Sequence, residues 1–217
     1  MEWNVLAGLG EEERRQVLAT ARRRRFRRQE VIFHAGDPGE ALHLIAKGRV
    51  AVYVTTPLGS TSTFAVLGPG EAVGELALVS PNAERTATAI ALEPTETLSL
   101  RRDQFEALRN AHPFVDRLLV DLLAARVRQL DADLVEALFT AAETRVLRRL
   151  ARLANQYGDA GGRAVIHLTQ EDLAGLAGTS RATVNRTLRS AQEAGILALR
   201  RGSIELLDLD ALQRRAR

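Results

Sequence analysis

The apolar residues of this chain change their spacing near residue 100. From Val31 to Leu100 they form short runs separated by glycine and proline, as in GDPG from residue 36 and GPGEAVG from residue 68. Short strands with evenly spaced turns are typical of an antiparallel roll or barrel. After Asp103 the apolar residues return every three or four positions, which is helical spacing. We therefore expect an α+β fold, with a jelly-roll-like β-roll first and helices after it.

Three parts follow from this change of spacing. In order, we expect the β-roll over residues 1–112, a long helix over residues 113–139 and a C-terminal domain over residues 140–217. Within the first part, one helix is expected over residues 10–21, and a second, capped by Asp103, is expected to end near Asn110. Pro113 then suits the first turn of the long helix.

The long helix carries an apolar stripe with alternating spacings of three and four residues. Its members are Val120, Leu123, Val127, Leu130, Leu134 and Ala137. Charged residues flank this heptad pattern on both sides. The length of the stripe favours pairing with a second copy of the chain over packing on its own domain. We expect a homodimer through the helix over residues 113–139.

The composition excludes several classes of protein. Among 217 residues, 46% are hydrophobic and 26% charged, which is typical of a globular protein. No stretch approaches the roughly 20 apolar residues of a membrane helix, so no membrane partner is expected. The absence of cysteine removes disulfides, iron–sulfur clusters and thiolate metal sites. The first residues lack a basic segment followed by an apolar run, so the expected location is the cytoplasm.

A helix, a tight turn and a second helix are expected after Leu168. Thr169 can cap the first helix, with Asp172 at the capping-box position, and Gly178 permits the turn. Ser180 then caps the second helix. This arrangement is typical of a helix-turn-helix that binds DNA.

The second of these helices combines a buried and a polar face. Val184 and Leu188 are four residues apart and are expected to be buried. On or near the exposed face lie Arg181, Ala182, Asn185, Arg186 and Arg189. Arginine can bind guanine O6 and N7, and asparagine can pair with adenine. A strand pair closing at residues 200–203 would add a wing, and Arg201 at its tip suits a DNA phosphate.

The run TQEDLA followed by GTSRATVNR resembles the recognition motif of the CRP/FNR superfamily of bacterial transcription regulators. The resemblance extends over the whole chain and implies a winged helix-turn-helix that binds double-stranded DNA. It implies that Arg181 and Arg186 read guanines. The full set of expected DNA contacts is Thr169, Gln170, Ser180, Arg181, Thr183, Asn185, Arg186 and Arg201. The family's frequent glutamate is Ala182 here, which cannot accept a hydrogen bond from cytosine N4, so base preference should relax there.

The stretch GELAL…RTA resembles the phosphate-binding cassette of cyclic-nucleotide-binding domains. Arg85 follows Gly74 by 11 residues, as in nucleotide-binding members. Arg85 would supply the positive charge, Glu75 would accept from the ribose 2′-OH, and amides at the start of a short helix would bind the phosphate. The expected cassette contacts are Gly74, Glu75, Leu76, Ala77, Arg85 and Thr86.

The base of the nucleotide stays open at this stage. Relatives that bind cyclic AMP place a polar pair on the dimer helix against adenine, and Leu130 and Asp131 stand there in this chain. Asp131 could accept from adenine N6, or from guanine N1 and N2 together. Cyclic AMP is the first expectation, cyclic GMP the second, and a regulator that acts without ligand and keeps a vestigial pocket the third.

The remaining expectations concern residues outside these motifs. A cupin-like enzyme fused to a DNA-binding tail is the alternative from another class, but no His/Asp/Glu set at metal-ligand spacing supports it. His34 and His43 are expected at a strand edge or on the surface. The arginine-rich run over residues 22–28 is expected to be a solvated face. The segment from Phe139 to Glu143 is the expected hinge, and contact of the Gly158 to Gly162 loop with RNA polymerase stays open.

Overall fold

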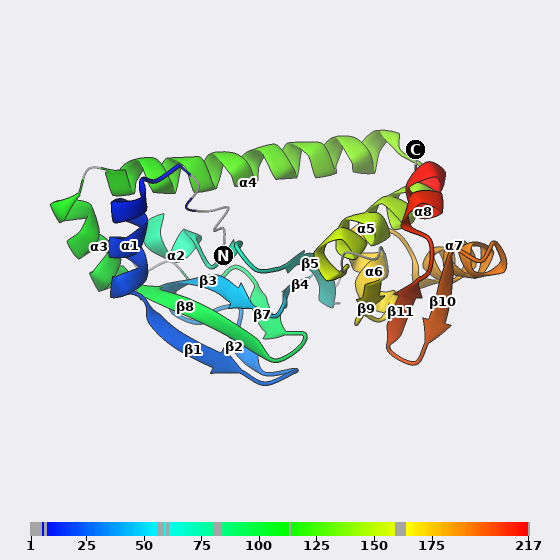
Figure 1. The fold of residues 1–217 in the computed structure, drawn as a ribbon, viewed down its shortest axis with the longest axis horizontal. Coiled ribbons are helices and arrows are strands. Elements are labelled where there is room, and N and C mark those ends of the chain that lie inside the picture. The colour runs from blue at the N-terminus through cyan, green and yellow to red at the C-terminus, as the bar shows by residue number, and fades with distance from the viewer. Residues whose placement is uncertain are drawn as a thin grey trace. The chain divides into compact units, whose positions relative to one another are not determined.

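The computed structural model describes residues 6, 8–55, 59, 61–79, 84–112, 114–158 and 164–216, which divide into two compact units. The first unit runs to Val54 and resumes over Val66–Leu130, and the second combines Thr55–Ala65 with Asp131–Arg217. Figure 1 labels the elements of both. No helix in the part of the chain that the structure describes is long and apolar enough to cross a membrane.

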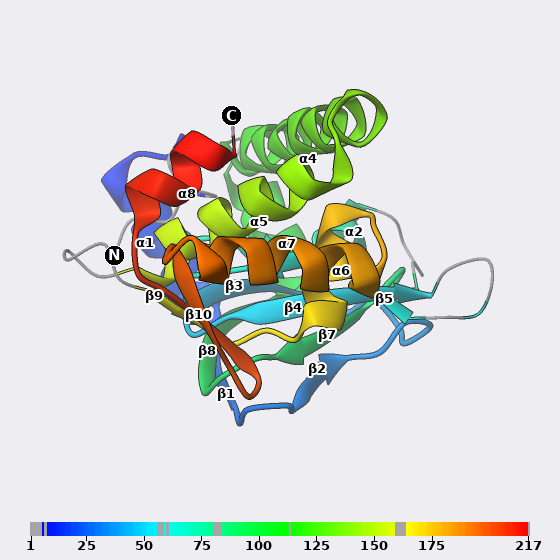
Figure 2. The same cartoon turned by 90° about the vertical axis from the view of Figure 1, so that its right-hand side faces the viewer.

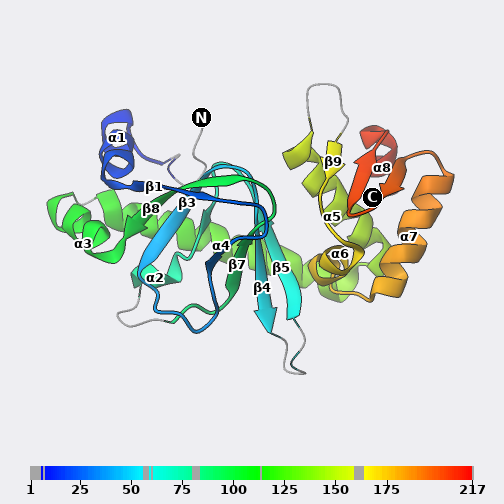
Figure 3. The same ribbon diagram turned by 90° about the horizontal axis from the view of Figure 1, so that it is seen from below.

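Two antiparallel sheets form the β-roll. In the described residues one sheet has the strand order β1-β8-β3-β6 and the other the order β2-β7-β4-β5. Figure 3 labels β1, β8 and β3 of the first sheet and β7, β4 and β5 of the second. The strands are β1 Arg22–Phe26, β2 Val31–Phe33, β3 Ala41–Lys47, β4 Val50–Thr55, β5 Thr61–Leu67, β6 Ala72–Val73, β7 Thr88–Ala91 and β8 Thr95–Arg101. The α+β class with a jelly-roll-like first half is confirmed.

The first strand lies in a segment where the sequence analysis expected none. β1 pairs with β8 from Arg22↔Ser99 to Phe26↔Thr95, whereas the apolar runs place the start of the roll at Val31. Arg22 to Arg25 are all exposed, which agrees with a solvated face. Because β1 is the outermost strand of its sheet, its charged side chains face water and hide the alternation that marks inner strands.

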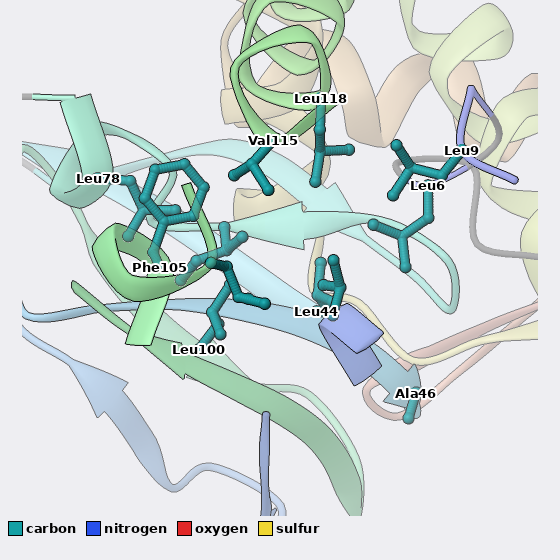
Figure 4. Close-up of a cluster of buried hydrophobic side chains, with 12 residues drawn as sticks. Leu6, Leu9, Leu44, Ala46, Leu78, Leu100, Phe105, Val115 and Leu118 are labelled. Carbon is teal, nitrogen blue, oxygen red and sulfur yellow. The ribbon is translucent and has the colours of Figure 1, made fainter. Parts of the chain in front are cut away.

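Helices pack over the first sheet and close its core. These are α1 Glu11–Thr20, α2 Leu76–Val79, α3 Arg102–Ala111 and the first turns of α4 Phe114–Phe139. Figure 4 shows Val115 and Leu118 of α4 reaching toward Leu44 and Phe105. Burying such side chains contributes roughly 1.5–3 kcal/mol each. The core thus joins the start of α4 to the sheet that carries the cassette.

The start of α3 differs from the expectation, and the expected start of α4 cannot be compared with the structure. Asp103 does not cap α3, because Arg101 occupies the N-cap and Asp103 lies in the first turn. There the Asp103 carboxylate accepts from Arg101 Nε at 3.1 Å, so it stabilises the helix start from inside. Pro113 lies outside the described residues, and α4 is described from Phe114.

The second unit is a winged helix-turn-helix. Its elements are α5 Ala142–Tyr157, β9 Ala164–Ile166, α6 Gln170–Ala177, α7 Arg181–Glu193, β10 Leu197–Arg200, β11 Ser203–Leu206 and α8 Leu209–Arg215 (Figure 2). The apolar face of α5 is buried, as expected from its spacing. β9 and α8 are additions that the sequence analysis missed. Most of the Gly158 to Gly162 loop lies outside the described residues.

Candidate functional site

Arg85 is a buried cation in the roll. Only 8% of its surface is exposed. Its Nη2 donates to the Ala41 carbonyl at 2.7 Å and its Nη1 to the Gly74 carbonyl at 3.2 Å. Its Nε is buried and has no hydrogen-bond partner in the described residues. Because a guanidinium offers five N–H donors and stays protonated, Arg85 presents unused donors and a full charge to an anion.

Carboxylates surround Arg85 without pairing to it. Burial lowers the pKa of the Arg85 guanidinium, whereas Asp37, Glu75 and Glu40 raise it. No ion pair within 4.0 Å joins Arg85 to an acidic side chain of the described residues. Removing a charge from water without a counter-ion is costly. The arrangement therefore favours an anionic ligand that completes the site.

The other cassette residues lie around this arginine. Gly74 has a φ of +85°, and a Cβ at this position would collide with Arg85 Nη1, so both its backbone angle and the guanidinium require glycine. Glu75 is half-buried and directly precedes α2, which begins at Leu76. Thr86 is exposed beside Arg85. The side chain of Ala77 lies outside the described ones.

Leu130 and Asp131, the residues expected to face the base, lie on α4. Both are exposed, and Leu130 keeps 41% of its surface accessible. The boundary between the two compact units falls between them. Their role toward a nucleotide therefore stays a proposal.

His43 corrects an expectation, since it lies neither at a sheet edge nor on the surface. It occupies the inner strand β3, is 6% exposed, and its Nδ1 lies 3.1 Å from the Thr97 hydroxyl. Its ring contacts the rings of Phe26 and Phe33. Burial, followed by the charges of Arg85 and Arg24, lowers the pKa of His43 from 6.5 to about 4. A neutral imidazole thus stands beside the cationic site.

Replacing His43 with glutamine should flatten the acid dependence of stability. In the unfolded chain His43 takes up a proton near pH 6.5, whereas in the folded protein its pKa is about 4. Wild-type stability is therefore lost as the pH falls through this window, by about 2 kcal/mol between pH 7 and 5 from this residue alone. Urea unfolding at both pH values measures the difference between wild type and variant. The exposed His34→Gln is the control, and an equal change in both variants would contradict the assignment.

The helix-turn-helix forms by the local interactions that the sequence predicts. The Thr169 hydroxyl accepts from the Asp172 amide at 3.1 Å, and the Asp172 carboxylate accepts from the Thr169 amide at 3.0 Å. Gly178 ends α6 in the left-handed conformation, with a φ of +58°. Ser180 caps α7 by accepting from the Thr183 amide at 3.2 Å. The capping box, the turn and the second cap are confirmed.

The residues expected on the exposed face of α7 differ in whether they contact other side chains of the described residues. Arg181 and Ala182 are exposed near its N-terminus. The Arg186 guanidinium pairs with Glu143 of α5 at 3.2 Å, although both side chains are mostly exposed. The Asn185 amide donates to Gln170 at 3.1 Å and accepts from Arg189 Nε at 3.1 Å. Base contacts by Asn185 or Arg186 would therefore replace interactions within the protein.

The wing is a hairpin of β10 and β11. The register ends at Arg200↔Ser203, so Arg201 and Gly202 form a two-residue turn, and Gly202 has a φ of +74°. A positive φ at this position is typical of tight hairpin turns. Arg201 is exposed at the tip, where the sequence analysis expected a phosphate contact.

Arg145 of α5 is a central residue that motif reasoning missed. Its guanidinium donates to the carbonyls of Ala137 and Thr140 at the end of α4, at 3.3 and 2.8 Å. It also donates to those of Ala177 and Gly178 in the turn after α6, at 2.8 Å each. One side chain therefore satisfies free carbonyls at two helix ends. Arg145 is one of several arginines along α5, and the sequence gives no signal that sets it apart.

A roll with a buried, unpaired arginine and a winged helix-turn-helix together define a DNA-binding transcription regulator with a cyclic-nucleotide-binding domain. Residues 23–112 match the cyclic nucleotide-binding domain family, and residues 144–215 match the Crp-like helix-turn-helix domain family. The chain is 38% identical over 206 residues to a cyclic AMP receptor protein from Thermus thermophilus, covering 95% of this chain and 93% of the relative. The chain belongs to the CRP/FNR superfamily of transcription regulators, which excludes the enzyme alternative.

Further similarities extend along nearly the whole chain. A CRP-like cAMP-activated global transcriptional regulator from Mycobacterium tuberculosis is 33% identical over 195 residues, covering 88% of this chain and 87% of that protein. The crystal structure of the Thermus thermophilus catabolite activator protein superposes with a TM-score of 0.56 at 37% identity, covering 98% of each chain.

Proposed function

We propose that this regulator acts as a homodimer that binds palindromic DNA under the control of a cyclic nucleotide, with cyclic AMP as the ligand. The observation that carries the proposal is the buried guanidinium of Arg85, whose Nε has no hydrogen-bond partner and which forms no ion pair within 4.0 Å with a carboxylate of the described residues. A cyclic phosphate has the charge and the acceptor oxygens to complete such a site.

The remaining ligand contacts are assigned by chemistry. Glu75 accepts from the ribose 2′-OH, and the backbone at Gly74 to Ala77 and the Thr86 hydroxyl bind phosphate oxygens. Leu130 and Asp131 contact the base. The names of two relatives refer to cyclic AMP, which supports adenine. Cyclic GMP is the second candidate, because a carboxylate at residue 131 can accept from guanine N1 and N2.

Calorimetric titration of the wild type with cyclic AMP and, separately, with cyclic GMP tests the ligand. The proposal expects saturable binding of cyclic AMP. Tighter binding of cyclic GMP would reassign the base and keep the phosphate site. Binding of neither would leave the regulator that acts without ligand and carries a vestigial pocket.

The exposed apolar residues of α4 support the homodimer. Val120, Val127, Leu130 and Leu134 of the predicted stripe are 63%, 55%, 41% and 58% exposed. Apolar residues with heptad spacing bury such surface against a second helix. Two chains paired in this way would present two α7 helices to successive major grooves, about 34 Å apart.

Leu134→Glu should dissociate this dimer. A buried carboxylate at the helix pairing leaves a charge without a partner, whereas the monomer tolerates it because Leu134 is exposed there. Light scattering should report half the wild-type mass at micromolar concentration. Arg128→Glu, a charge change at another exposed position of α4, is the control and should stay dimeric. A dimeric Leu134→Glu would contradict the pairing through this stripe.

In this mechanism the ligand changes the balance between two states of the dimer. It can favour the DNA-binding state only by making better contacts in that state. Thr140 and Ala141 separate α4 from α5, within the segment assigned as the hinge.

A further inference from the structure

A row of aromatic rings lies against the cationic site. The guanidinium carbon of Arg85 lies 4.1 Å from the centre of the Phe33 ring. The Phe33 ring is 6.2 Å from that of His43, and the His43 ring is 6.1 Å from that of Phe26. None of these rings belongs to the cassette motif. Phe33 is therefore the aromatic residue through which the roll acts directly on Arg85.

The two backbone contacts of Arg85 do not by themselves fix the tilt of the guanidinium plane. Its two Nη atoms bind the carbonyls of Ala41 and Gly74, which restrain one end of the fork. An aromatic face attracts a guanidinium and prefers it stacked flat, most strongly where water is excluded. Phe33 is 8% exposed and Arg85 is equally buried. The Phe33 ring therefore lies where it can restrain the tilt of the guanidinium.

We propose that Phe33 is a positioning residue that holds the Arg85 guanidinium in the orientation required to bind the ligand phosphate. The inference rests on the proposed function, since it assigns Phe33 a role in the same site. Neutral His43 fits this role, because a charged imidazole next to the Phe33 ring would repel the guanidinium. Preorganising a charged group in this way raises affinity by lowering the cost of ordering it on binding.

Phe26 provides a matched control for this proposal. It contacts His43 at nearly the same ring distance as Phe33 and is buried to nearly the same extent, at 7% exposed. However, Phe26 lies under Arg24 rather than Arg85. Phe26→Leu and Phe33→Leu thus remove equal aromatic volume from the same roll, and only the second removes the contact with Arg85.

The first experiment is calorimetric titration of the full chain with cyclic AMP. Phe33→Leu should weaken binding about tenfold, the scale of the cost of ordering one flexible side chain on binding. Phe33→Tyr keeps the aromatic face and should restore affinity, and Phe26→Leu should bind like wild type. Equal losses in Phe33→Leu and Phe26→Leu would show a packing effect and overturn the proposal, as would an unchanged Phe33→Leu. In either case wild-type binding leaves the proposed function standing, whereas a wild type that binds no nucleotide overturns both.

The second experiment needs no ligand. In ¹⁵N-arginine spectra of the wild type, the Arg85 side-chain N–H signals, assigned by their loss in Arg85→Lys, should be shifted upfield by the ring current of Phe33. Phe26→Leu should leave this shift unchanged, and Phe33→Leu should remove it. Signals at the ordinary positions of arginine in the wild type would overturn the stacked geometry.

Discussion

Arg85→Leu is expected to abolish nucleotide binding while leaving the fold and the dimer intact. The substitution removes the charge that the carbonyls of Gly74 and Ala41 hold in place. Truncating one partner of a buried charged pair costs about 2–5 kcal/mol, which corresponds to a loss of affinity from about thirtyfold to several thousandfold. Calorimetry measures the loss, and light scattering measures the mass of the dimer.

Two further variants separate charge from geometry in this experiment. Arg85→Lys keeps the charge but loses the planar fork, so its affinity should lie between those of wild type and Arg85→Leu. Arg25→Leu removes one positive charge from the exposed strand β1 and should bind like wild type. A similar loss in Arg25→Leu would mean that the overall charge of the roll, and not Arg85, attracts the ligand.

Arg181→Ala and Arg186→Ala are each expected to weaken binding to the operator by about 1–3 kcal/mol, with the loss confined to particular base pairs. Arg181 is exposed at the start of α7, where side chains reach the major groove. Arg186 must first leave Glu143, so its loss should be the smaller of the two. Electrophoretic shifts on the operator and on single-base variants measure both effects.

The wing supplies the contrast for this experiment. Arg201→Ala should weaken binding to all sequences alike and lower the salt dependence by about one counter-ion, because a phosphate contact carries no sequence information. Equal losses on operator and random DNA for Arg181→Ala would contradict base reading by α7. Because Ala182 is exposed and cannot accept a hydrogen bond from a base, the operator base pair that it faces should show little base preference.

The sequence predicts this fold best where interactions are local. The caps at Thr169 and Ser180 and the turn at Gly178 each depend on residues within a few positions, and all three are confirmed. Arg85 and Gly74 could be paired from the cassette spacing, and the structure brings them into contact. Their roles toward a ligand remain predictions.

The failures share a different cause, which is contact between residues far apart in the chain. The sequence did not reveal β1, because its residues do not alternate between apolar and polar. It is a strand because it pairs with β8, some 70 residues later. His43 was expected near the surface because no local pattern reveals that Thr97, Phe26 and Phe33 enclose it. Asp103 was placed as a cap because residue type alone does not fix where a helix begins.

The four carbonyls held by Arg145 have a mechanical consequence. A rotation at Thr140 and Ala141 cannot change the angle between α4 and the turn before α7 without breaking charge-assisted hydrogen bonds. Arg145 therefore ties the C-terminal end of α4 to the turn before α7. A large rotation at this point requires the hydrogen bonds of Arg145 to break first. We therefore expect such a rotation to occur in one step and not gradually.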